Sequence, residues 1–418
     1  MMALGAALLL FALLGAPLFA VIAASAMLGF AGSGIDLSVM AIEFFGIAET
    51  PVLVAIPLFT FAGFLLSEGR APQRLVRLSQ ALLGWLPGGL AIIALATCAL
   101  FTAFTGASGV TIIALGALFM PAFAAAGYGQ RFNLGLITAG GSLGLLFAPS
   151  LPLILYGVVA EAPIDDLFLA GIVPGTLMLV VLALYAYWSN RHVGSDLRAL
   201  SLGEIKDALL DAKWELPLPI VVLGGIYSGY FAVSEAAAVT ALYVAIVELV
   251  ILREIAWHDL PKIIRESMVL VGAILVILGM SLASTNYMID SEVPQRLFAL
   301  IGEFIETPAT FFAALLVFLL ILGAILDIFS AIVLVVPLVL PVAMQYDVHP
   351  VHLGIVFLAA MELGYLTPPV GLNLFISSYR FDKDITEVCL ATLPFLLLLA
   401  ICVVIIAYAP GLSLWLVN

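Results

Sequence analysis

Long apolar segments constrain this chain more than any other feature of its sequence. Stretches of about 20 apolar residues recur along the whole length, and a helix of that length crosses a hydrocarbon core of about 30 Å. Hydrophobic residues make up 64% of the 418 residues and charged residues only 10%, against roughly half and a quarter in soluble domains. Because backbone groups in lipid must be satisfied within the chain, we predict an all-α polytopic membrane protein.

Charge and cysteine usage exclude several other classes of protein. The net charge is −13, whereas nucleic-acid binding requires a basic face, so we predict no nucleic-acid partner. The chain carries no HExxH, Walker or dinucleotide-binding pattern, and we predict neither an enzyme nor a resident cofactor. Cys98, Cys389 and Cys402 lie in apolar runs without CxxC spacing, which is typical of small buried hydrophobic residues.

The basic residues indicate how the spans are oriented. Arginine and lysine gather in loops at 70–77, 191–213, 253–265 and 380–383. The loops between them, at 36–49, 161–166, 290–306 and around 347, are acidic and poor in arginine and lysine. By the positive-inside rule, the basic loops lie in the cytoplasm. We therefore predict a multi-pass protein whose N-terminus is cytoplasmic and whose C-terminus lies outside.

Two apolar stretches, 90–125 and 309–345, do not fit the alternation of the loops. Each is roughly twice the length of one crossing, and the loops at its two ends belong to the same face. Each also has a small or polar break in its middle, at 105–109 and at 327–330. We therefore predict two re-entrant helical hairpins. Single spans are expected at roughly 4–29, 51–67, 133–158, 168–189, 215–232, 234–252, 266–289, 352–378 and 388–408.

Similarities between the two halves of the chain predict an inverted repeat. Pro-Gln-Arg-Leu occurs at 72–75 and again at 294–297, and a nearly equal shift lays 144–149 over 364–369. An odd number of predicted crossings separates the two hairpins, so the two copies have opposite orientations. The predicted units are a first repeat at 1–190, a cytoplasmic loop with a linking span at 191–223, and a second repeat at 224–418. Their broken spans are those at 133–158 and 352–378.

An amphipathic segment precedes each predicted hairpin. Leucines within 75–82 share one helical face opposite arginine and glutamine, and residues 297–304 repeat this pattern. Such helices lie in the plane of the membrane interface. We expect them to be arms that connect the hairpins to the other spans; ordinary loop helices are the alternative.

Helix breaks inside the bilayer carry the predicted chemistry. A helix that stops there exposes unpaired carbonyls at its C-terminal end and unpaired N–H groups at its N-terminal end. These groups are costly in hydrocarbon unless a cation or an anionic solute satisfies them, as happens in transporters with broken helices. Proline and glycine produce such breaks at 144–150 and 364–371, and hydroxyl and amide side chains lie nearby.

Candidate ligands follow from the two hairpin tips and the two broken spans. The ion-binding candidates are Thr105, Gly106, Ser108, Gly109, Gly144, Pro149, Asp327, Ser330, Gly364, Thr367 and Pro368. The solute-binding candidates are Ser150, Thr367, Gly371 and Asn373. Ordinary helix packing is the alternative for each, since small and hydroxyl residues are common between membrane helices.

Two carboxylates in apolar surroundings allow more than one interpretation. Asp327 at the second hairpin tip either binds a cation or caps the helix that follows it. Glu362 lies two residues before Gly364 and either relays protons or faces a wet cavity. The residues alone leave both questions open.

The segment Gly364-Tyr-Leu-Thr-Pro-Pro-Val-Gly-Leu-Asn373 resembles the C-terminal signature of the large membrane subunit of TRAP transporters, the tripartite ATP-independent periplasmic systems. The family pattern departs at Ala107 and Ala148, which both lie at the first predicted ion site. The resemblance covers essentially the whole chain, because further segments match at 83–90, 127–128, 152–158, 167–175 and 234–239.

The resemblance implies an elevator-type fold of the ion-transporter superfamily. It implies uptake of a small anionic or zwitterionic organic solute across the bacterial inner membrane, with sodium as the coupling ion. It also implies two partners, a periplasmic solute-binding protein and a small membrane subunit. The sodium sites of the family carry over to Ser108 and Gly109 with 144–149, and to 327–330 with 367–369.

Other functions compete with this interpretation. Gly106-Ala-Ser-Gly109 is also the nucleophile pattern of rhomboid intramembrane proteases, in which His352 would have to serve as the base. The predicted topology places that serine and that histidine at opposite faces. A stand-alone sodium/dicarboxylate symporter shares the architecture and is separated only by the family motifs. A passive channel is a further alternative, although paired broken helices suit alternating access.

Overall fold

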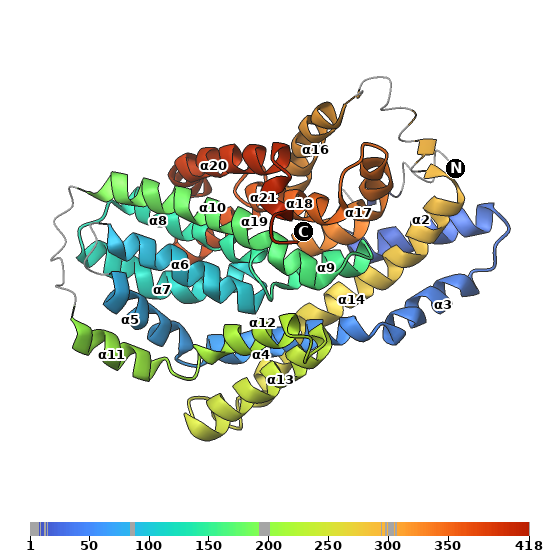
Figure 1. The fold of residues 1–418 in the computed structure, drawn as a ribbon. Helices are drawn as coiled ribbons and strands as arrows, with labels where there is room; N and C mark the ends of the chain where they lie inside the picture. The colour runs from blue at the N-terminus through green and yellow to red at the C-terminus, as the bar shows by residue number, and fades with distance from the viewer. Residues whose placement is uncertain are drawn as a thin grey trace.

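The computed structural model describes residues 16–83, 88–191, 201–293 and 307–417, together with 8, 10, 11, 14, 295, 296, 299 and 305. Within these residues every regular element is a helix (Figure 1). The first part of the chain contains α2 (Leu18–Gly32), α3 (Ser38–Gly46), η1 (Ile47–Glu49), η2 (Pro51–Val54), α4 (Ala55–Glu68), α5 (Ala71–Leu83), α6 (Gly89–Thr105), α7 (Ser108–Ala125), α8 (Gln130–Gly140), η3 (Leu143–Leu146), α9 (Leu151–Val159) and α10 (Ile164–Asn190). The second part contains α11 (Leu202–Asp211), α12 (Pro217–Tyr227), α13 (Val233–Ile246), the π-helix η4 (Val247–Ile251), α14 (Leu260–Asp290), α16 (Pro308–Gly323), α17 (Ile328–Met344), α18 (Pro350–Gly364), α19 (Leu372–Phe381), α20 (Ile385–Tyr408) and α21 (Gly411–Leu414).

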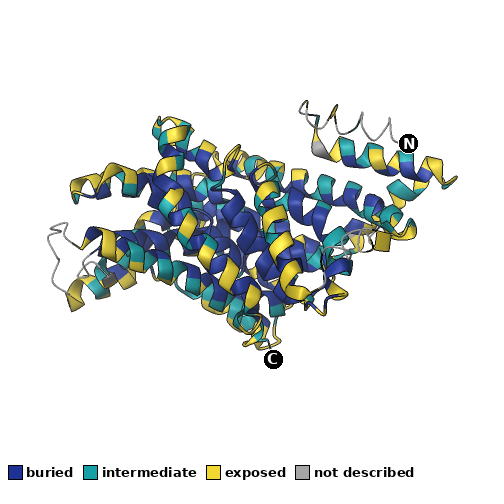
Figure 2. Ribbon diagram, turned by 90° about the horizontal axis from the view of Figure 1, so that it is seen from above, coloured by how far each residue is buried: buried dark blue, intermediate teal, exposed yellow. Residues whose placement is uncertain are grey.

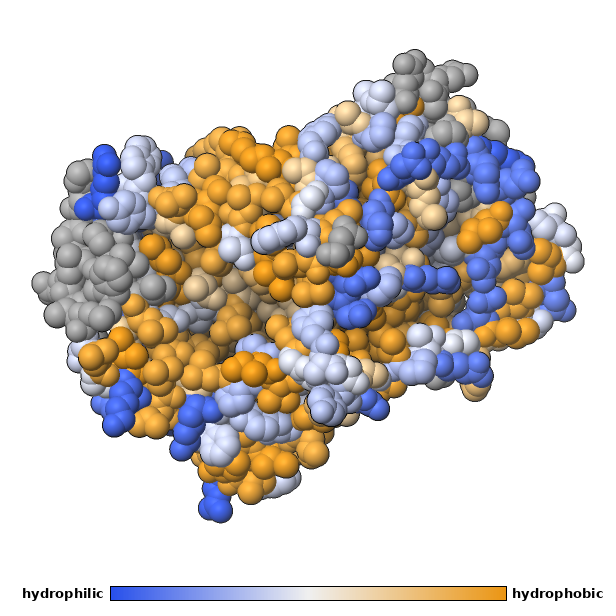
Figure 3. All heavy atoms as spheres, viewed as in Figure 1, coloured by the Kyte–Doolittle hydropathy of each residue, from blue (hydrophilic) through white to orange (hydrophobic). Residues whose placement is uncertain are grey.

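The helices of the described residues have the length and composition of membrane spans. Six are long and apolar enough to cross a membrane, and up to seven if the bent pair α8–η3 and α9 is one span. Apolar side chains also cover much of the face of the molecule that Figure 3 shows. The predicted all-α membrane class is therefore confirmed. The six helices are Pro51–Glu68, Ser108–Ala125, Ile164–Asn190, Val233–Ile251, Leu260–Asp290 and Ile385–Tyr408.

Helices α6 and α7 form a hairpin. Between them Gly106 takes a left-handed φ of 64°, which glycine adopts readily, and Ala107 is extended. The hydroxyl oxygens of Thr102 and Thr111 meet across the turn at 2.6 Å, whereas the same stretch of straight helix would separate them by about 13 Å. The chain therefore reverses within the first predicted hairpin.

Helices α16 and α17 form the second hairpin. Tyr346, just after α17, donates its hydroxyl to the carbonyl of Ile305, just before α16, at 2.7 Å. The ring of Tyr346 also stacks on that of Phe311, with 5.1 Å between the centroids. The two ends of this segment meet, so the chain reverses around residues 324–327.

Each hairpin is followed by a span that is interrupted in its middle. Helix α8 leads through η3 into α9 with a bend of 45°. Helix α18 ends at Gly364, and α19 begins only at Leu372. Ala148–Pro149 and Pro368–Pro369 are cis peptide bonds. The structure thus has breaks where both broken spans are predicted, whereas the division into inverted repeats and the depth of the tips in the membrane stay predictions.

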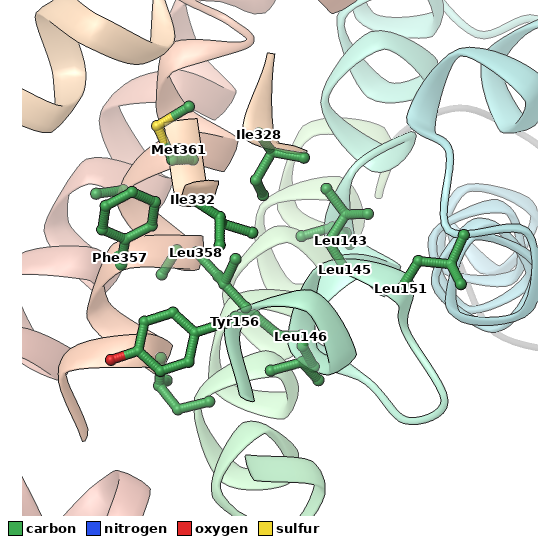
Figure 4. Close-up of a cluster of buried hydrophobic side chains, with 14 of the residues drawn as sticks. Leu143, Leu145, Leu146, Leu151, Tyr156, Ile328, Ile332, Phe357, Leu358 and Met361 are labelled. Atoms are coloured by element: carbon green, nitrogen blue, oxygen red, sulfur yellow. The ribbon is translucent and has the colours of Figure 1, made fainter. Parts of the chain in front are cut away.

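Helix α18 lies at the centre of the molecule. All its residues from Val351 to Gly364 are buried, and the middle of the ribbon in Figure 2 is correspondingly dark blue. A β-carbon on Gly354 of α18 would approach the ring of Tyr156 of α9 to 2.5 Å. Figure 4 shows Tyr156 among the buried side chains of η3, α17 and α18. The two broken spans therefore pack directly against each other.

A second group of helices, α2, α3, α4, α13 and α14, lies beside the hairpins, and we call it the scaffold (Figure 1). Helix α14 packs against α2, α3 and α4, and α4 packs against α13. Helix α4 also touches the first hairpin closely, because a β-carbon on Gly63 would lie 2.6 Å from the carbonyl oxygen of Phe104. The scaffold therefore contacts the first hairpin near its tip.

Two segments predicted as loops contain helices. Helix α3 lies within the acidic loop at 36–49, and α11 lies within the basic loop at 191–213. Short helices of this kind are stabilised mainly by tertiary packing, and here α3 packs against α14 and α11 against α5. The predicted arm at 75–82 is α5, whereas most of the second arm, 297–304, lies outside the described residues.

Candidate ion and solute site

A cavity of about 340 Å³ lies where the two hairpin tips, the second broken span and the scaffold meet. Phe64 of α4 and Leu270 of α14 face it from the scaffold, and Leu145 faces it from η3. The cavity brings together predicted candidates from both hairpins. Its remaining lining residues are Gly106, Ala107, Ser108, Gly109, Val110, Asp327, Ile328, Phe329, Tyr365, Leu372 and Ile376.

Asn373 joins three elements beside this cavity. Its side-chain oxygen accepts a hydrogen bond from Ser108 Oγ at 2.7 Å, and its Nδ2 donates to the carbonyl of Thr138 at 3.2 Å. Its backbone N–H donates to the carbonyl of Tyr365 at 3.2 Å. The hydroxyls of Thr138 and Ser377 lie 2.8 Å apart. Buried polar contacts therefore fasten the first hairpin and the first broken span to the second broken span.

Helix α6 packs against the first break and supplies a hydrogen-bond donor to it. The hydroxyl of Thr102 donates to the carbonyl of Gly141 at 2.8 Å and lies 2.6 Å from that of Thr111. Gly144 approaches α6 so closely that a β-carbon would lie 2.2 Å from the carbonyl oxygen of Ala99. A larger residue than glycine does not fit at position 144.

Three buried hydroxyls, that of Thr105 at the first hairpin tip and those of Ser142 and Ser150 at the first break, have no hydrogen-bond partner within the described structure. Thr105 ends α6, and Ser142 and Ser150 flank η3. Leu151 packs on Gly106, which brings Ser150 towards the hairpin tip. Buried hydroxyls are normally hydrogen-bonded, and oxygen atoms of this kind together with carbonyls at a helix break suit a sodium ion.

Asp327 caps α17. Its Oδ1 accepts hydrogen bonds from the N–H groups of Phe329 and Ser330, both at 3.0 Å. Its Oδ2 accepts a hydrogen bond from the Ser330 hydroxyl at 2.5 Å. Of the two roles considered for Asp327, this geometry shows the cap, and it engages Ser330 in the same arrangement.

Replacing Asp327 with alanine is expected to lower the free energy of unfolding by about 1 kcal/mol, because two N–H groups of α17 lose their acceptor. Asp327→Asn keeps an acceptor oxygen and should retain most of that stability. Thermal unfolding of the purified protein measures the difference, with Thr307→Ala at the N-terminus of α16 as a matched cap on the same hairpin. An asparagine variant as unstable as the alanine variant would contradict the capping role.

The second broken span holds the second hairpin tip directly. The N–H groups of Val370 and Gly371 donate to the carbonyl of Ala324 at 3.2 and 3.1 Å. The N–H of Ile328 donates to the hydroxyl of Tyr365 at 2.8 Å. The orphan groups of the broken helix and of the hairpin tip therefore satisfy one another.

The predicted candidates at the second break take part in this contact. A β-carbon on Gly364 would lie 2.4 Å from the α-carbon of Gly323. The hydroxyl of Thr367 donates to the carbonyl of Leu363 at 2.8 Å, and Pro368 precedes a cis proline bond. Several polar groups here are thus engaged within the chain, in contrast to the unpartnered hydroxyls at the first break.

Sequence reasoning missed six polar residues of the site: Thr102, Thr111, Thr138, Ser142, Ser377 and Tyr365. A signal was available for some of them. Thr102 precedes a candidate by three residues, Thr111 follows one by three, and Ser377 follows one by four, so each shares a helix face with a candidate. Tyr365 had no such signal, because its hydrogen-bond partner, the N–H of Ile328, lies 37 positions away in the second hairpin.

Glu362 of α18 is fully buried, and neither of its carboxyl oxygens has a hydrogen-bond partner among the described residues. It is not among the residues that line the 340 Å³ cavity. A buried carboxyl group in a membrane helix marks a functional position by default.

Paired hairpins and broken helices around a central cavity define the class of this protein: a secondary-transporter-type membrane protein. The model of the tripartite ATP-independent periplasmic transporter DctM component matches residues 4–412. The chain therefore belongs to the DctM family of TRAP transporter large permeases, and the resemblance of its motifs is confirmed.

Individual relatives agree with this assignment. The chain is 34% identical to the C4-dicarboxylate TRAP transporter large permease protein DctM of Pseudomonas aeruginosa, over 91% of this chain and 89% of that one. It is also 34% identical to the isethionate TRAP transporter permease protein DctMQ of Oleidesulfovibrio alaskensis, over 90% of this chain and 59% of that longer protein. The crystal structure of the Alcanivorax borkumensis YdaH transporter has a similar fold, with a TM-score of 0.56 at 15% identity over 89% of this chain and 87% of that one.

The structure does not assemble the dyad that a rhomboid-like protease would need. The Ser108 hydroxyl donates to Asn373. The ring nitrogens of His352 contact Ser413 Oγ at 3.2 Å and the carbonyl of Ala407 at 3.3 Å. A serine nucleophile requires its base within hydrogen-bond reach, and the relatives are transporter permeases.

Proposed function

We propose that this chain is the large permease subunit of a binding-protein-dependent secondary transporter. It takes up a small organic acid across the bacterial inner membrane, with sodium as the coupling ion, by an elevator movement. The observation that carries the proposal is the cavity between both hairpin tips and the second broken span, faced by the scaffold through Phe64 and Leu270.

The first break is the better-supported sodium site. Thr105, Ser142 and Ser150 offer buried hydroxyl oxygens that no group of the described structure uses. At the second break, by contrast, the carboxylate of Asp327 caps α17. We therefore assign one sodium ion to the hydroxyls and carbonyls of the first break, and a second ion at 327–330 with 367–369 requires the cap to rearrange.

An anionic solute fits the uncapped helix starts that border the cavity. Helices α7 and α19 begin at Ser108 and Leu372, which both line the cavity, and neither helix has a side-chain cap. Free N–H groups at a helix N-terminus attract a carboxylate. At the start of α19 the N–H groups of Asn373 and Leu374 already donate to the carbonyls of Tyr365 and Gly371. The start of α7, where Ser108 contacts the solute-binding candidate Asn373, is therefore the proposed carboxylate site.

The overall sequence similarity of this chain to its relatives does not identify the solute. Relatives named for C4-dicarboxylate and for isethionate are equally similar to this chain, at 34% identity. Both compounds are small organic anions, so this chemical class is what we propose. The choice within the class is assigned to the periplasmic solute-binding protein, which together with a small membrane subunit completes the transporter.

The elevator movement follows from the way the elements are fastened. Hydrogen bonds of Asn373 and Tyr365 tie both hairpins and the first broken span to the second broken span. We propose that these elements move as one body against the scaffold, with α5 as the arm between α4 and the first hairpin. The ion gradient drives the movement because sodium binds the two states with different affinities.

The test is uptake by the reconstituted three-component transporter. We expect uptake to require an inward sodium gradient, and the Thr105→Ala/Ser150→Ala variant to need about tenfold more sodium for half-maximal uptake, equivalent to about 1.4 kcal/mol of binding. Thr240→Ala is the matched control, because the hydroxyl of Thr240 is buried but bonds to its own helix at Ala236. Uptake that persists unchanged without a sodium gradient would refute the coupling.

A stand-alone symporter is the second candidate, because the architecture alone does not distinguish it. The same reconstitution separates the two. Uptake by this chain without the binding protein and the small subunit would favour the symporter, whereas strict dependence on both partners would favour the tripartite system.

A further inference from the structure

Three carboxylates surround Arg74 of the arm helix α5. Its guanidinium pairs with Glu215 at 2.5 Å, with Glu248 at 3.5 Å and, more closely still, with Glu254. Glu254 also accepts a hydrogen bond from the backbone N–H of Arg70 at 2.7 Å. We call Arg74, Glu215, Glu248 and Glu254 the Arg74 cluster. It joins the turn between α4 and α5 to the start of α12 and to η4.

The charges of the Arg74 cluster do not balance. One guanidinium faces three carboxylates, and the side chains of Glu248 and Glu215 are only 0% and 5% exposed. Oε2 of each of these two residues is buried and has no hydrogen-bond partner in the described part of the chain. Buried carboxylates without a counter-charge are strongly unfavourable, so the cluster as it stands lacks positive charge.

We propose that the Arg74 cluster binds one proton, on Glu248, and that this proton holds the arm helix α5 against the scaffold. Glu248 is the most deeply buried of the three acids and makes the longest contact with the guanidinium. Glu215 and Glu254 compete more effectively for Arg74. A proton needs only one free carboxylate oxygen. A metal cation would need several, and most carboxylate oxygens of the cluster already accept from Arg74 or from the Arg70 N–H.

Among the described residues, no group other than Arg74 supplies positive charge to Glu248. Burial lowers the pKa of Arg74, but its hydrogen bonds and charge contacts with Glu215 and Glu254 outweigh burial and leave that pKa above its ordinary value. The guanidinium therefore stays fully charged and contributes a single positive charge. Tyr243 of α13, also near Glu215, donates its hydroxyl to the carbonyl of Trp214 at 2.8 Å.

The position of the Arg74 cluster allows it to hold the arm helix α5 in place. Oε2 of Glu248 would lie 2.5 Å from a β-carbon on Gly69, in the turn between α4 and α5. A cavity of about 20 Å³ is lined by both Glu215 and Thr105 of the first hairpin tip, and that volume is enough for one water molecule. Loss of the proton would leave three charged carboxylates that repel one another beside the arm. Because movement of α5 would let water reach these charges, α5 is expected to loosen as the pH rises.

The proton is tested on the purified full-length chain by infrared spectroscopy. We expect the carbonyl band of protonated carboxyl groups at neutral pH to lose intensity in Glu248→Gln. The band should be unchanged in Glu204→Gln, the matched control at an exposed position of α11. A band that is identical in wild type and Glu248→Gln overturns the proposal.

Hydrogen exchange tests whether the proton on Glu248 holds α5 in place. Raising the pH is expected to speed amide exchange in α5, beyond the intrinsic effect of pH, in wild type but not in Glu248→Gln, which mimics the protonated state. Equal acceleration in both proteins would show that the proton does not hold the arm.

A second variant keeps the proposal testable if Glu248→Gln fails to fold. Glu254→Gln removes a neighbouring negative charge, so the carboxyl band should disappear at a lower pH than in wild type. An unmoved midpoint overturns the proposal. Neither measurement requires uptake, so failure of the sodium coupling proposed above would leave both results interpretable.

Discussion

Replacing Gly144 or Gly364 with alanine is expected to abolish uptake and to lower the yield of folded protein. A β-carbon would lie 2.2 Å from the Ala99 carbonyl at the first position and 2.4 Å from the Gly323 α-carbon at the second. The obstacle in both cases is backbone, which cannot rotate aside as a side chain can. Overpacking of this kind costs about 1–3 kcal/mol or more. Thermal unfolding and uptake of the reconstituted transporter are the measurements.

Gly272→Ala is the matched control for both substitutions. Gly272 lies within the membrane helix α14, and a β-carbon there would meet no atom within 4 Å. Alanine is also the better helix former, by roughly 1 kcal/mol. We therefore expect Gly272→Ala to leave stability and uptake at or above the wild-type level. If Gly144→Ala and Gly364→Ala behaved like this control, the close packing of the breaks against the hairpins would be wrong.

Asn373→Ala is expected to reduce uptake by at least about tenfold, since two buried partners lose their hydrogen bonds. The hydroxyl of Ser108 loses its acceptor and the carbonyl of Thr138 loses its donor. Both partners belong to elements that we propose move together, so the loss weakens the connection of the first hairpin to the second broken span. Initial uptake rates at saturating solute and sodium are the measurement.

Asn190→Ala serves as the control for the loss of a buried asparagine. Among the described residues its side chain donates within α10, to the carbonyl of Ala186 at 2.9 Å. We expect this variant to transport at a rate close to that of wild type. Equal loss of uptake in Asn190→Ala and Asn373→Ala would mean that the contact between α7 and α19 has no special role.

The positions of the breaks could be read from the sequence because their causes are local. Glycine at 106 and proline at 149 and 368 act through their own backbone chemistry, and the structure interrupts the helices at these places. Charge counting was less reliable for short segments. It assigned the residues of α3 and α11 to loops, since it does not register the packing that stabilises a short helix.

The sequence did not show which polar groups at the breaks already have hydrogen-bond partners. From the sequence, Asp327 was compatible with a cap and with a cation ligand, and its bonds to Phe329 and Ser330 show the cap in this conformation. Thr105 and Ser150 were candidates on residue type alone, and the structure adds that their hydroxyls have no partner among the described residues. Which oxygen is free depends on neighbours that are distant in sequence.

The membrane class, the two hairpins with their breaks, and the transporter family could all be predicted from the residues. Apolar length, proline and glycine act within one segment, and family motifs are local strings. Which polar groups meet became visible in the packed helices, where Ser108 contacts Asn373 from 265 positions away and Arg74 contacts Glu215 from 141 positions away. The reason is that a buried hydrogen bond or ion pair depends on how helices pack in space, and periodicity along the chain reports only which face of a helix a residue occupies.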